Sequence, residues 1–272
     1  ILPLGSLLDI DDLGLSFGGV KALQGFCLRL DAGQILALIG PNGAGKTTVF
    51  NCISGLYHAD QGRITLDGKP LNNLRPHRVA RLGIARTFQN IELFKHMSTV
   101  DNLLLGRHLH MRTGVLSGMA LLGQFSPAAK EETRHRRRVE EIIDFLDLQA
   151  VRNEFVGNLP YGVQKVVELG RALAMEPRVL LLDEPAAGMN LEEKQDLRIW
   201  IEDIRQLFGI SVLLIEHDMQ FVGDLADRVI ALNHGQRIAE GTPDEVRRHP
   251  DVLKAYLGED PAGTACSPSP TA

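Results

Sequence analysis

A glycine-rich segment, GPNGAGKT at residues 40–47, constrains the fold of this chain more than any other feature. It matches the pattern G-x-x-x-x-G-K-[ST] and follows ILALI (35–39), a continuous apolar run typical of a parallel strand buried on both faces. A helix is expected to begin at Lys46 and to end near Gly55. This strand, loop and helix predict an α/β chain with a mainly parallel core sheet.

The same loop predicts phosphate binding. Its glycines allow backbone N–H groups to point inward at a helix N-terminus, where they form a nest for an anion. Lys46 would reach the β- and γ-phosphates of a nucleotide, and the Thr47 hydroxyl would ligate Mg²⁺. An ordinary glycine turn is the alternative, which the flanking strand and helix disfavour. The residues expected to bind a nucleoside triphosphate are Gly40, Pro41, Asn42, Gly43, Ala44, Gly45, Lys46, Thr47 and Thr48.

Two acidic residues end a second buried strand, RVLLLDEP (178–185). In an α/β sheet the C-terminal ends of parallel strands face the ligand crevice. Asp183 is therefore expected to hold Mg²⁺ through water, and Glu184 to orient and polarise an attacking water molecule. An acidic pair at a surface turn is the alternative, but the four apolar residues that lead into the pair disfavour it.

Two other polar residues are weak candidates when each is taken alone. His217 follows a third buried strand in SVLLIEHD (211–218), a position where histidine usually has a structural role. Gln89 lies in ARTFQNIELF (85–94), which has no distinctive context of its own. The segment NLPYGVQ (158–164) raises a separate question, because it places Pro160 and Gly162 where an apolar-periodic helix begins. A glycine there allows a ligand to come close to the backbone.

Composition limits the class of protein. The 272 residues, 44% hydrophobic and 23% charged, suit one large or two modest domains that need no metal or disulfide for stability. A net charge of −5 argues against nucleic-acid binding. Cys27, Cys52 and Cys266 have unrelated spacings, which fits a reducing cytoplasm. We expect no secretory peptide and no membrane span, because no apolar run approaches ~20 residues.

The remaining pattern alternates strands and helices. Strands are predicted over 6–39 and a hairpin over 64–71, where an Asp-Gly pair marks the turn. Residues 100–175 are expected to be mainly helical, with a helix after Ser126-Pro127 that buries one face: Val139, Ile142, Ile143 and Leu146. A helix over 191–208 and a hairpin over 228–241 complete the expected core.

Two segments are predicted to lie outside that core. The basic run RHRRR (134–138) is interpreted as a solvated helix face, with contact to a phospholipid headgroup or a partner as the alternative. The tail over 259–272 is small, polar and proline-rich, and is expected to be disordered.

Taken in order, these motifs resemble those of the ABC-transporter ATPase domain. The matching positions are Lys46, Gln89, LPYGVQ (159–164), Asp183-Glu184 and His217, and in that family LSGGQ fills the third place. The resemblance implies a P-loop ATPase domain over 6–258, with an N-terminal antiparallel β subdomain and an inserted helical subdomain at about 100–175. ATP hydrolysis is the implied activity, with ATP and Mg²⁺ as cofactors.

In that family two such domains dimerise head to tail, and the LSGGQ segment of one caps the γ-phosphate bound to the other. The segment that would do so here consists of Leu159, Pro160, Tyr161, Gly162, Val163 and Gln164. Pro160 replaces the usual serine and so removes a hydroxyl donor and a backbone N–H. Asn190 stands where an aspartate is usual. The loss of the serine at position 160 predicts slower hydrolysis at the half-site that the segment completes, or dependence of that half-site on the Tyr161 and Gly162 amides.

The resemblance also assigns roles to single residues. Glu184, His217 and Gln89 would be catalytic, with His217 holding the γ-phosphate and Gln89 contacting Mg²⁺ or the attacking water. Thr47, Gln89 and Asp183 would surround the metal. Phe17 matches the aromatic residue that stacks on adenine, with core packing as the alternative. The segment 91–103 would receive a coupling helix of the permease, with a plain surface loop as the alternative.

Several details resemble one branch of the family, the ATP-binding subunits of branched-chain amino acid importers, to which urea and short-amide importers are very similar. They are SFGGVKAL (16–23), ARTFQNIELF (85–94), the tyrosine in LPYGVQ, LLLDEPAAGMN (180–190) and IAEGTPDEV with VLKAYLGE (238–259). The branch implies two integral membrane permeases, a second ATP-binding subunit (identical or a paralogue), a periplasmic solute-binding protein and no nucleic acid. The chain would lie at the cytoplasmic face of the inner membrane. A lipopolysaccharide-type exporter ATPase, a soluble ABC ATPase acting on nucleic acid and a nucleotide-binding regulator are the alternatives.

Overall fold

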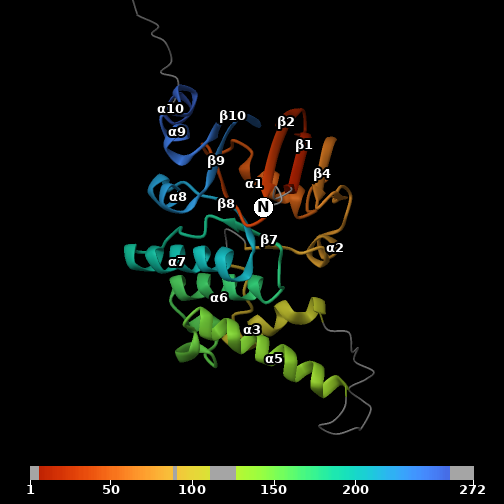
Figure 1. Ribbon diagram of the computed structural model, residues 1–272, viewed down its shortest axis with the longest axis vertical. Helices are drawn as coiled ribbons and strands as arrows, with labels where there is room; N and C mark the ends of the chain where they lie inside the picture. Colours follow the sequence, from red (N-terminus) through yellow and green to blue (C-terminus); the bar gives the residue numbers. More distant parts are fainter. Residues whose placement is uncertain (1–5, 88–90, 111–126, 258–272) are drawn as a thin grey trace, which may run out of the picture.

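Two sheets and the helices packed on them form the described part of the chain, residues 6–87, 91–110 and 127–257 of a computed structural model (Figure 1). The strands are β1 (Ser6–Phe17), β2 (Val20–Asp31), β3 (Ile35–Ile39), β4 (Gln61–Leu66), β5 (Lys69–Pro70), β6 (Ile84–Arg86), β7 (Val179–Asp183), β8 (Ser211–Ile215), β9 (Arg228–Asn233) and β10 (Gln236–Gly241). The α-helices are α1 (Lys46–Ile53), α2 (Pro76–Arg81), α3 (Thr99–Gly106), α5 (Pro127–Phe145), α6 (Tyr161–Leu173), α7 (Leu191–Phe208), α8 (Met219–Leu225), α9 (Pro243–Arg247) and α10 (Pro250–Leu257). Short 3₁₀ helices are η1 (Arg107–His110), η2 (Gln149–Val151) and η3 (Val156–Asn158).

The larger sheet has six strands in the order β10-β9-β3-β8-β7-β6. All neighbouring strands in it are parallel except β9 and β10, which form the predicted antiparallel hairpin. The smaller sheet is antiparallel, in the order β2-β1-β4-β5. The mainly parallel core sheet and the antiparallel N-terminal sheet are therefore confirmed.

Strand β3 shows why a continuous apolar run was needed at this position. Its alternate residues Ile35, Ala37 and Ile39 belong to one hydrophobic core, and Leu36 and Leu38 belong to a second core on the opposite face. Side chains on a strand point alternately to its two faces, so a strand covered on both sides must be apolar throughout.

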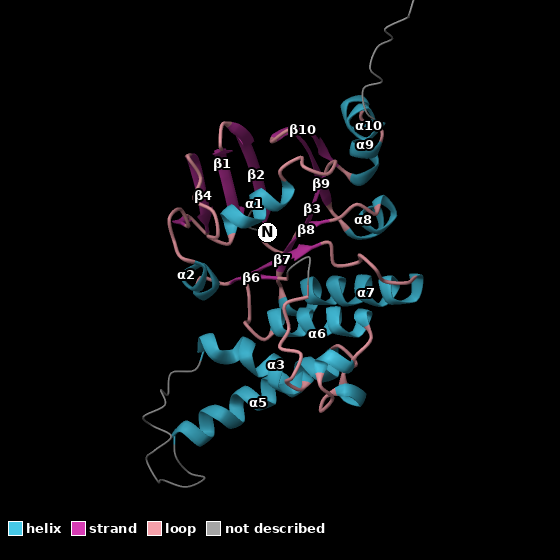
Figure 2. Ribbon diagram, turned by 180° about the vertical axis from the view of Figure 1, so that it is seen from behind, coloured by secondary structure: helices cyan, strands magenta, loops and turns pink. Residues whose placement is uncertain are grey.

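The two cores lie on opposite sides of the six-stranded sheet. Helix α1 contributes Val49, Phe50 and Ile53 to the core that the two sheets share. On the other face, α7, α6, α3 and α5 follow one another away from the sheet (Figure 2). Helix α5 buries Val139, Ile142 and Ile143, and Leu146, directly after the helix, is buried as well, as the spacing predicted.

Several local predictions are confirmed, and others lie outside the described residues. Helix α1 spans Lys46–Ile53, and the β4–β5 turn has positive φ angles at both Asp67 and Gly68. Cys27 and Cys52 are free thiols.

Ser126, Gln89 and the tail over 259–272 are not among the described residues. Within the described ranges, no helix combines the length and apolar character that a membrane crossing requires.

Asn102, which is fully buried on α3, holds the segment that leads into this helix. Its side-chain oxygen accepts a hydrogen bond from the Phe94 N–H at 2.9 Å. Its amide nitrogen donates to the Phe94 carbonyl at 3.1 Å and to the Ser98 carbonyl at 3.0 Å. Ser98 caps α3 by accepting a hydrogen bond from the Asp101 N–H at 3.2 Å. The conformation of residues 94–98 therefore depends on one buried amide.

We expect Asn102→Ala to lower the free energy of unfolding by about 2–4 kcal/mol, because buried backbone groups lose their partners. Urea unfolding followed by circular dichroism measures this change. Asn153→Ala is the matched control: Asn153 is exposed, and its substitution should change the value by less than about 0.5 kcal/mol. Equal losses in the two variants would contradict the role given to Asn102.

Candidate functional site

The ends of three adjacent parallel strands bring the predicted site residues together. Strand β8 lies between β3 and β7, with Leu38 and Asp183 both paired to Ile215. The glycine-rich loop follows β3, Glu184 follows β7, and His217 lies two residues beyond β8. Segments far apart in the sequence thus meet at one sheet edge, the place where α/β proteins bind ligands.

The glycine-rich loop is shaped by backbone that excludes side chains. Gly40, Gly43 and Gly45 have φ angles of 148°, 80° and 107°, a region that favours glycine. A Cβ on Gly40 would overlap the Leu232 carbonyl, and one on Gly45 would lie 2.7 Å from the Ala22 carbonyl oxygen. The loop can therefore keep this curl only with glycine at these positions.

Lys46 lies within this loop and is 6% exposed. Its ammonium group donates hydrogen bonds to the carbonyls of Gly40 at 2.7 Å and Pro41 at 2.9 Å. Burial lowers the pKa of Lys46, and the charges of Glu184 and Asp183 act in the opposite direction. The next residue, Thr47, is exposed on the first turn of α1, where its hydroxyl is available to a ligand.

Asp183 is 1% exposed and has an arginine partner. Arg86 at the end of β6 donates to its Oδ2 at 2.9 Å, and also to the side chain of Asn51 on α1 at 2.7 Å. Burial raises the pKa of Asp183, and its hydrogen bond and ion pair with Arg86 lower it. The Arg86 side chain thereby joins the strand that carries the acid to the helix that follows the glycine-rich loop.

The second oxygen of Asp183, Oδ1, is buried and has no hydrogen-bond partner among the described residues. A carboxylate oxygen and a threonine hydroxyl are hard ligands of the kind that Mg²⁺ prefers, and Mg²⁺ usually keeps several waters. Within the described ranges, no group of three or more His, Cys, Asp or Glu residues could hold a metal. Asp183 and Thr47 therefore fit a magnesium ion held by few protein atoms.

Glu184 and His217 contact each other directly. The His217 Nε2 and Glu184 Oε1 atoms are 2.7 Å apart, and because a carboxylate only accepts, the imidazole donates. Glu184 has a φ angle of 49°, an uncommon conformation for a residue with a Cβ. The Lys165 ammonium supports it by donating to the Glu184 carbonyl at 3.2 Å.

Glu216 joins the loops that carry these two residues. It is almost fully buried and accepts hydrogen bonds from the Ala186 N–H at 2.8 Å and the His217 N–H at 3.1 Å. Burial raises the pKa of Glu216, and these backbone hydrogen bonds lower it. The carboxylate therefore sets the position of the β7 loop relative to the β8 loop.

Phe17 is 47% exposed at the end of β1, so core packing does not explain it. Its ring lies edge-on to the ring of Tyr57, with centroids 5.2 Å apart. Tyr57 follows α1 and is also exposed. The two rings form an apolar surface that a planar base can contact.

In the segment Leu159–Gln164, packing within the chain itself requires glycine at position 162. Pro160 is the N-cap of α6, which begins at Tyr161, and no side chain caps this helix. A Cβ on Gly162 would overlap the carboxylate of Glu193 on α7. Glycine is therefore needed here to pack against α7, whether or not a ligand approaches from outside.

The segment after Glu184 packs on the same helix start. Gly188 has a φ angle of 77°, and a Cβ there would lie 3.0 Å from the Tyr161 ring. Asn190 is the N-cap of α7 and accepts a hydrogen bond from the Glu193 N–H at 3.0 Å. Asparagine thus performs the capping that an aspartate would provide.

Sequence reasoning missed several residues of this site. Arg86 lies three positions before Gln89, and Glu216 immediately before His217, but only their contacts distinguish them. Tyr57 and Glu193 also had no motif of their own. Glu216 directly follows the apolar residues of β8, and a charged residue in such a buried context could have been recognised from the sequence. Gln89 lies outside the described residues, so its place in the site stays a prediction.

Two families match this chain. Residues 23–187 match the family described as ABC transporter. Residues 236–262, which cover β10, α9 and α10, match the family described as branched-chain amino acid ATP-binding cassette transporter.

Similar proteins cover nearly the whole chain. The high-affinity branched-chain amino acid transport ATP-binding protein BraF of Pseudomonas aeruginosa is 42% identical over 254 residues, 93% of this chain and 98% of that protein. LivG of Escherichia coli, which has the same description, is 40% identical over 253 residues, again covering 93% and 98%. A crystal structure of a nucleotide-free ATP-binding cassette from an ABC transporter superposes with a TM-score of 0.81 at 31% identity, covering 94% of this chain and all of the other. The chain is therefore an ATP-binding and ATP-hydrolysing member of the ABC transporter family, among the branched-chain amino acid transport ATP-binding proteins.

Proposed function

We propose that this chain is the ATP-hydrolysing subunit of an importer for branched-chain or related amino acids, and that it works with separate permease subunits at the cytoplasmic face of the membrane. The observation that carries the proposal is the hydrogen bond between Glu184 and His217, 2.7 Å long, at the strand edge that also holds Lys46 and Asp183. These are the parts that hydrolysis of a nucleoside triphosphate requires. The ATPase domain of this proposal extends over 6–258, with its helical subdomain at about 100–175.

In the proposed reaction each residue has a distinct task. The backbone N–H groups of residues 43–48 and the Lys46 ammonium bind the β- and γ-phosphates. Glu184 accepts a proton from the attacking water, and His217 orients the Glu184 carboxylate and lies within reach of the γ-phosphate. Thr47 and Asp183 would hold Mg²⁺, which would supply positive charge against the phosphate oxygens. Phe17 and Tyr57 receive the adenine.

The start of α6 supports a head-to-tail dimer, with an identical chain or a paralogue as partner. Helix α6 has 13 residues, and its first turn has no capping side chain. The first N–H groups and the helix dipole together favour an anion at such an end. Pro160 and Tyr161 are exposed there, as a contact with ATP bound to a partner requires.

An apolar groove supports contact with a permease. It has a volume of about 430 Å³ and is lined by residues of α2, β6, α3, η1 and α6, among them Leu105 and Leu109, together with Leu56 after α1 and Met175 after α6. Leu56 and Leu105 are exposed, which is unusual for leucines that have no partner. The predicted coupling segment 91–103 lies just before the part of α3 that lines this groove, so we place the permease contact in the groove itself.

The proposed solute rests on similarity. The C-terminal match and the relatives described as branched-chain amino acid transport proteins favour this class. A sulfate/thiosulfate import ATP-binding protein, CysA of Methylococcus capsulatus, is nevertheless 37% identical over 243 residues, covering 65% of that protein. Sequence identity between ATP-binding subunits therefore distinguishes poorly between importers of different solutes, because the solute binds to other subunits. A urea or short-amide importer is the second candidate.

Uptake by cells that lack this subunit tests the solute class. We expect loss of leucine, isoleucine and valine uptake, restored by the wild-type gene but not by Lys46→Ala, because that variant cannot bind the phosphates. Urea uptake in the same cells is the comparison. Unchanged amino acid uptake with loss of urea uptake would overturn the proposed solute and leave the ATPase assignment intact.

Glu184→Gln should lower ATP hydrolysis by at least about 100-fold, because the general base is lost while the phosphate loop is unchanged. ATP binding should persist. Because ATP binding closes the proposed head-to-tail dimer and hydrolysis reopens it, the variant should accumulate as an ATP-bound closed dimer. Phosphate release and size-exclusion chromatography measure the two effects. Glu132→Gln, on the exposed face of α5, is the control and should behave as wild type. Normal turnover by Glu184→Gln would exclude this residue as the base.

Pro160→Ser should raise ATP turnover of the assembled transporter, by about tenfold if one charge-assisted hydrogen bond to the γ-phosphate is restored. The backbone of Pro160, with φ of −55° and ψ of 151°, already suits a capping serine. Steady-state hydrolysis with permeases present is the measurement. An unchanged rate would show that the missing hydroxyl does not limit hydrolysis.

A further inference from the structure

Helix α5 divides the basic run RHRRR (134–138) between two environments. His135 is 2% exposed and packs toward the core with Val139. Arg134, Arg137 and Arg138, together with Glu141, follow the spacing i, i+3, i+4 and i+7 and lie on one stripe of the helix. Arg136 lies outside this stripe and forms an ion pair with Glu132 at 3.1 Å. The run is therefore more than a uniformly solvated face.

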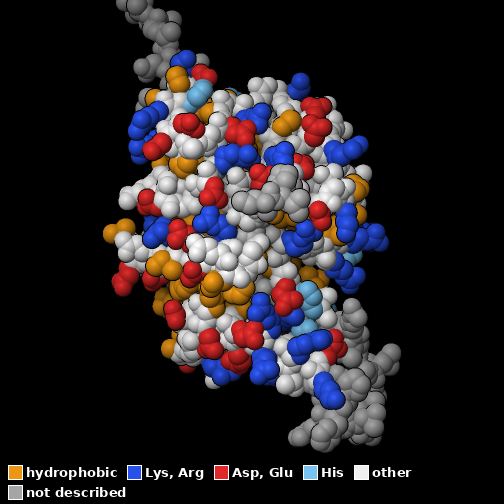
Figure 3. Space-filling view, viewed as in Figure 1, with side chains coloured by type: hydrophobic (Ala, Val, Ile, Leu, Met, Phe, Trp, Pro, Cys, Tyr) orange, Lys and Arg blue, Asp and Glu red, His pale blue; other side chains and the backbone are white. Residues whose placement is uncertain are grey.

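The stripe lines a hollow of about 530 Å³ between α5, η1 and the loop that joins α6 to β7. This volume falls within the range of sites for small molecules. Arg107 and His110 from η1, and Glu176 from the loop, complete its wall. In the space-filling view, blue and pale blue side chains lie over this lower, helical part of the molecule, with red side chains among them (Figure 3).

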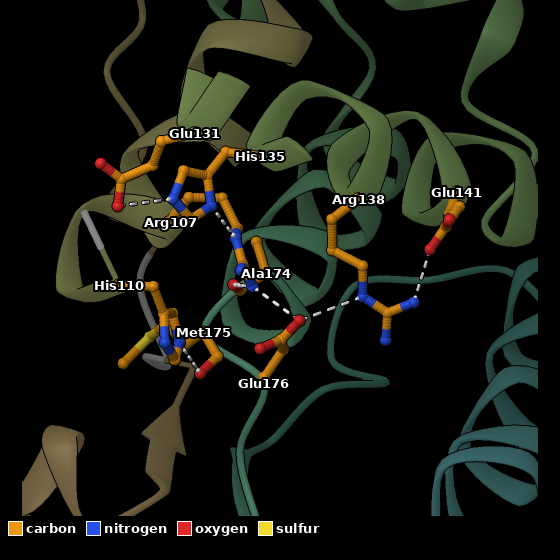
Figure 4. Close-up of polar contacts among 9 residues, drawn as sticks. All are labelled: Arg107, His110, Glu131, His135, Arg138, Glu141, Ala174, Met175 and Glu176. Atoms are coloured by element: carbon orange, nitrogen blue, oxygen red, sulfur yellow. Dashed lines mark hydrogen bonds and ion pairs between the residues drawn. The ribbon is translucent and has the colours of Figure 1, made fainter. Parts of the chain in front are cut away.

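Arg107 is the fixed element of the hollow, 5% exposed. Its Nε donates to His135 Nδ1 at 3.2 Å, its Nη1 donates to the Ala174 carbonyl at 2.8 Å, and Nη1 lies 3.0 Å from Glu176 Oε1 (Figure 4). Since arginine only donates, His135 accepts at Nδ1 and is neutral. Burial lowers the pKa of His135, and the charges of Arg107 and Arg134 lower it further. The wall is thus rigid and electropositive before any ligand arrives.

The charges around the hollow do not balance. Arg138 pairs with Glu141 at 2.7 Å and lies 3.4 Å from Glu176. Arg134 and Arg137 form no ion pair or hydrogen bond with any described residue. Among the residues that line the hollow, four arginines face two glutamates. Glu131 lies behind this lining, 3.8 Å from His135. The lining therefore has an excess of positive charge, opposite in sign to the charge of about −1.5 to −2 that a phosphomonoester carries at neutral pH.

We propose that this hollow binds the phosphate group of a phosphomonoester, either of a soluble metabolite or of an anionic lipid headgroup. Guanidinium groups bind phosphate oxygens through paired N–H donors, and of the four that line this hollow, those of Arg134 and Arg137 have no partner among the described residues. The site shares no residue with the nucleotide site. It borders the apolar groove described above, since Leu109 and Met175 line the groove while His110 and Glu176 line the hollow.

Binding of glycerol 3-phosphate to the full chain tests the proposal, with ADP present at saturation so that the phosphate loop is occupied. Isothermal titration calorimetry should detect binding to the wild type. Arg134→Gln and Arg137→Gln should each weaken it about twofold to fivefold, as expected for partly exposed charge pairs, and the double variant about tenfold. Arg136→Gln is the matched control, with the same loss of charge on the same helix, and should bind as wild type.

Flotation with phosphatidylcholine vesicles, with and without phosphatidic acid, separates the two sources of phosphate. Binding to phosphatidic acid alone would assign the hollow to a lipid headgroup, and binding of glycerol 3-phosphate as well would assign it to soluble phosphomonoesters. The midpoint temperature of thermal unfolding should be the same for Arg134→Gln, Arg136→Gln and Arg137→Gln. If neither probe binds, or if Arg136→Gln weakens binding as much as its neighbours, the hollow is not a phosphate site.

Discussion

The parallel pairing of β3, β8 and β7 is the constraint on which the rest of the site depends. Because the three strands run in the same direction, their C-terminal ends reach one edge together and deliver the glycine-rich loop, His217 and the Asp183-Glu184 pair. Both faces of these strands are covered by apolar cores, which prevents the strands from changing register. The loops of the site are thus positioned by strands that are apolar except for Asp183 at the end of β7 and Ser211 at the start of β8.

Buried charge then ties the loops of this edge to one another. Arg86 connects Asp183 to α1, and Glu216 connects the loop after β7 to the loop after β8. Arg86 and Asp183 form a buried ion pair, and the buried Glu216 accepts backbone hydrogen bonds, so losing either set of contacts would leave a buried charge without its partners. The positions of Asp183, Glu184 and His217 are therefore coupled, and they respond together to anything that binds at the edge.

The start of α6 is linked to the same loop from the helical side. Glu193 occupies the space above Gly162, the Tyr161 ring lies against Gly188, and Lys165 donates to the Glu184 carbonyl. A contact made by the exposed Pro160 and Tyr161 would therefore act on side chains that touch the loop of Glu184. This arrangement explains why a helix begins with such an unusual sequence even before a partner is considered. It also gives a physical path by which a bound neighbour can affect hydrolysis.

The sequence by itself determined the fold class and indicated the glycine-rich loop and the Asp183-Glu184 pair, because each depends on local rules: glycine where side chains are excluded, apolar residues where both faces are covered, and acids where a strand ends. It also identified the family through the order of its motifs. Only the tertiary structure showed which residues hold these groups in place, such as Arg86, Glu216 and Glu193. Only the tertiary structure showed that residues of RHRRR, predicted to be a solvated helix face, line a hollow. The reason is that a charge or a small residue acquires its role from whatever lies opposite, and that partner comes from a distant part of the chain.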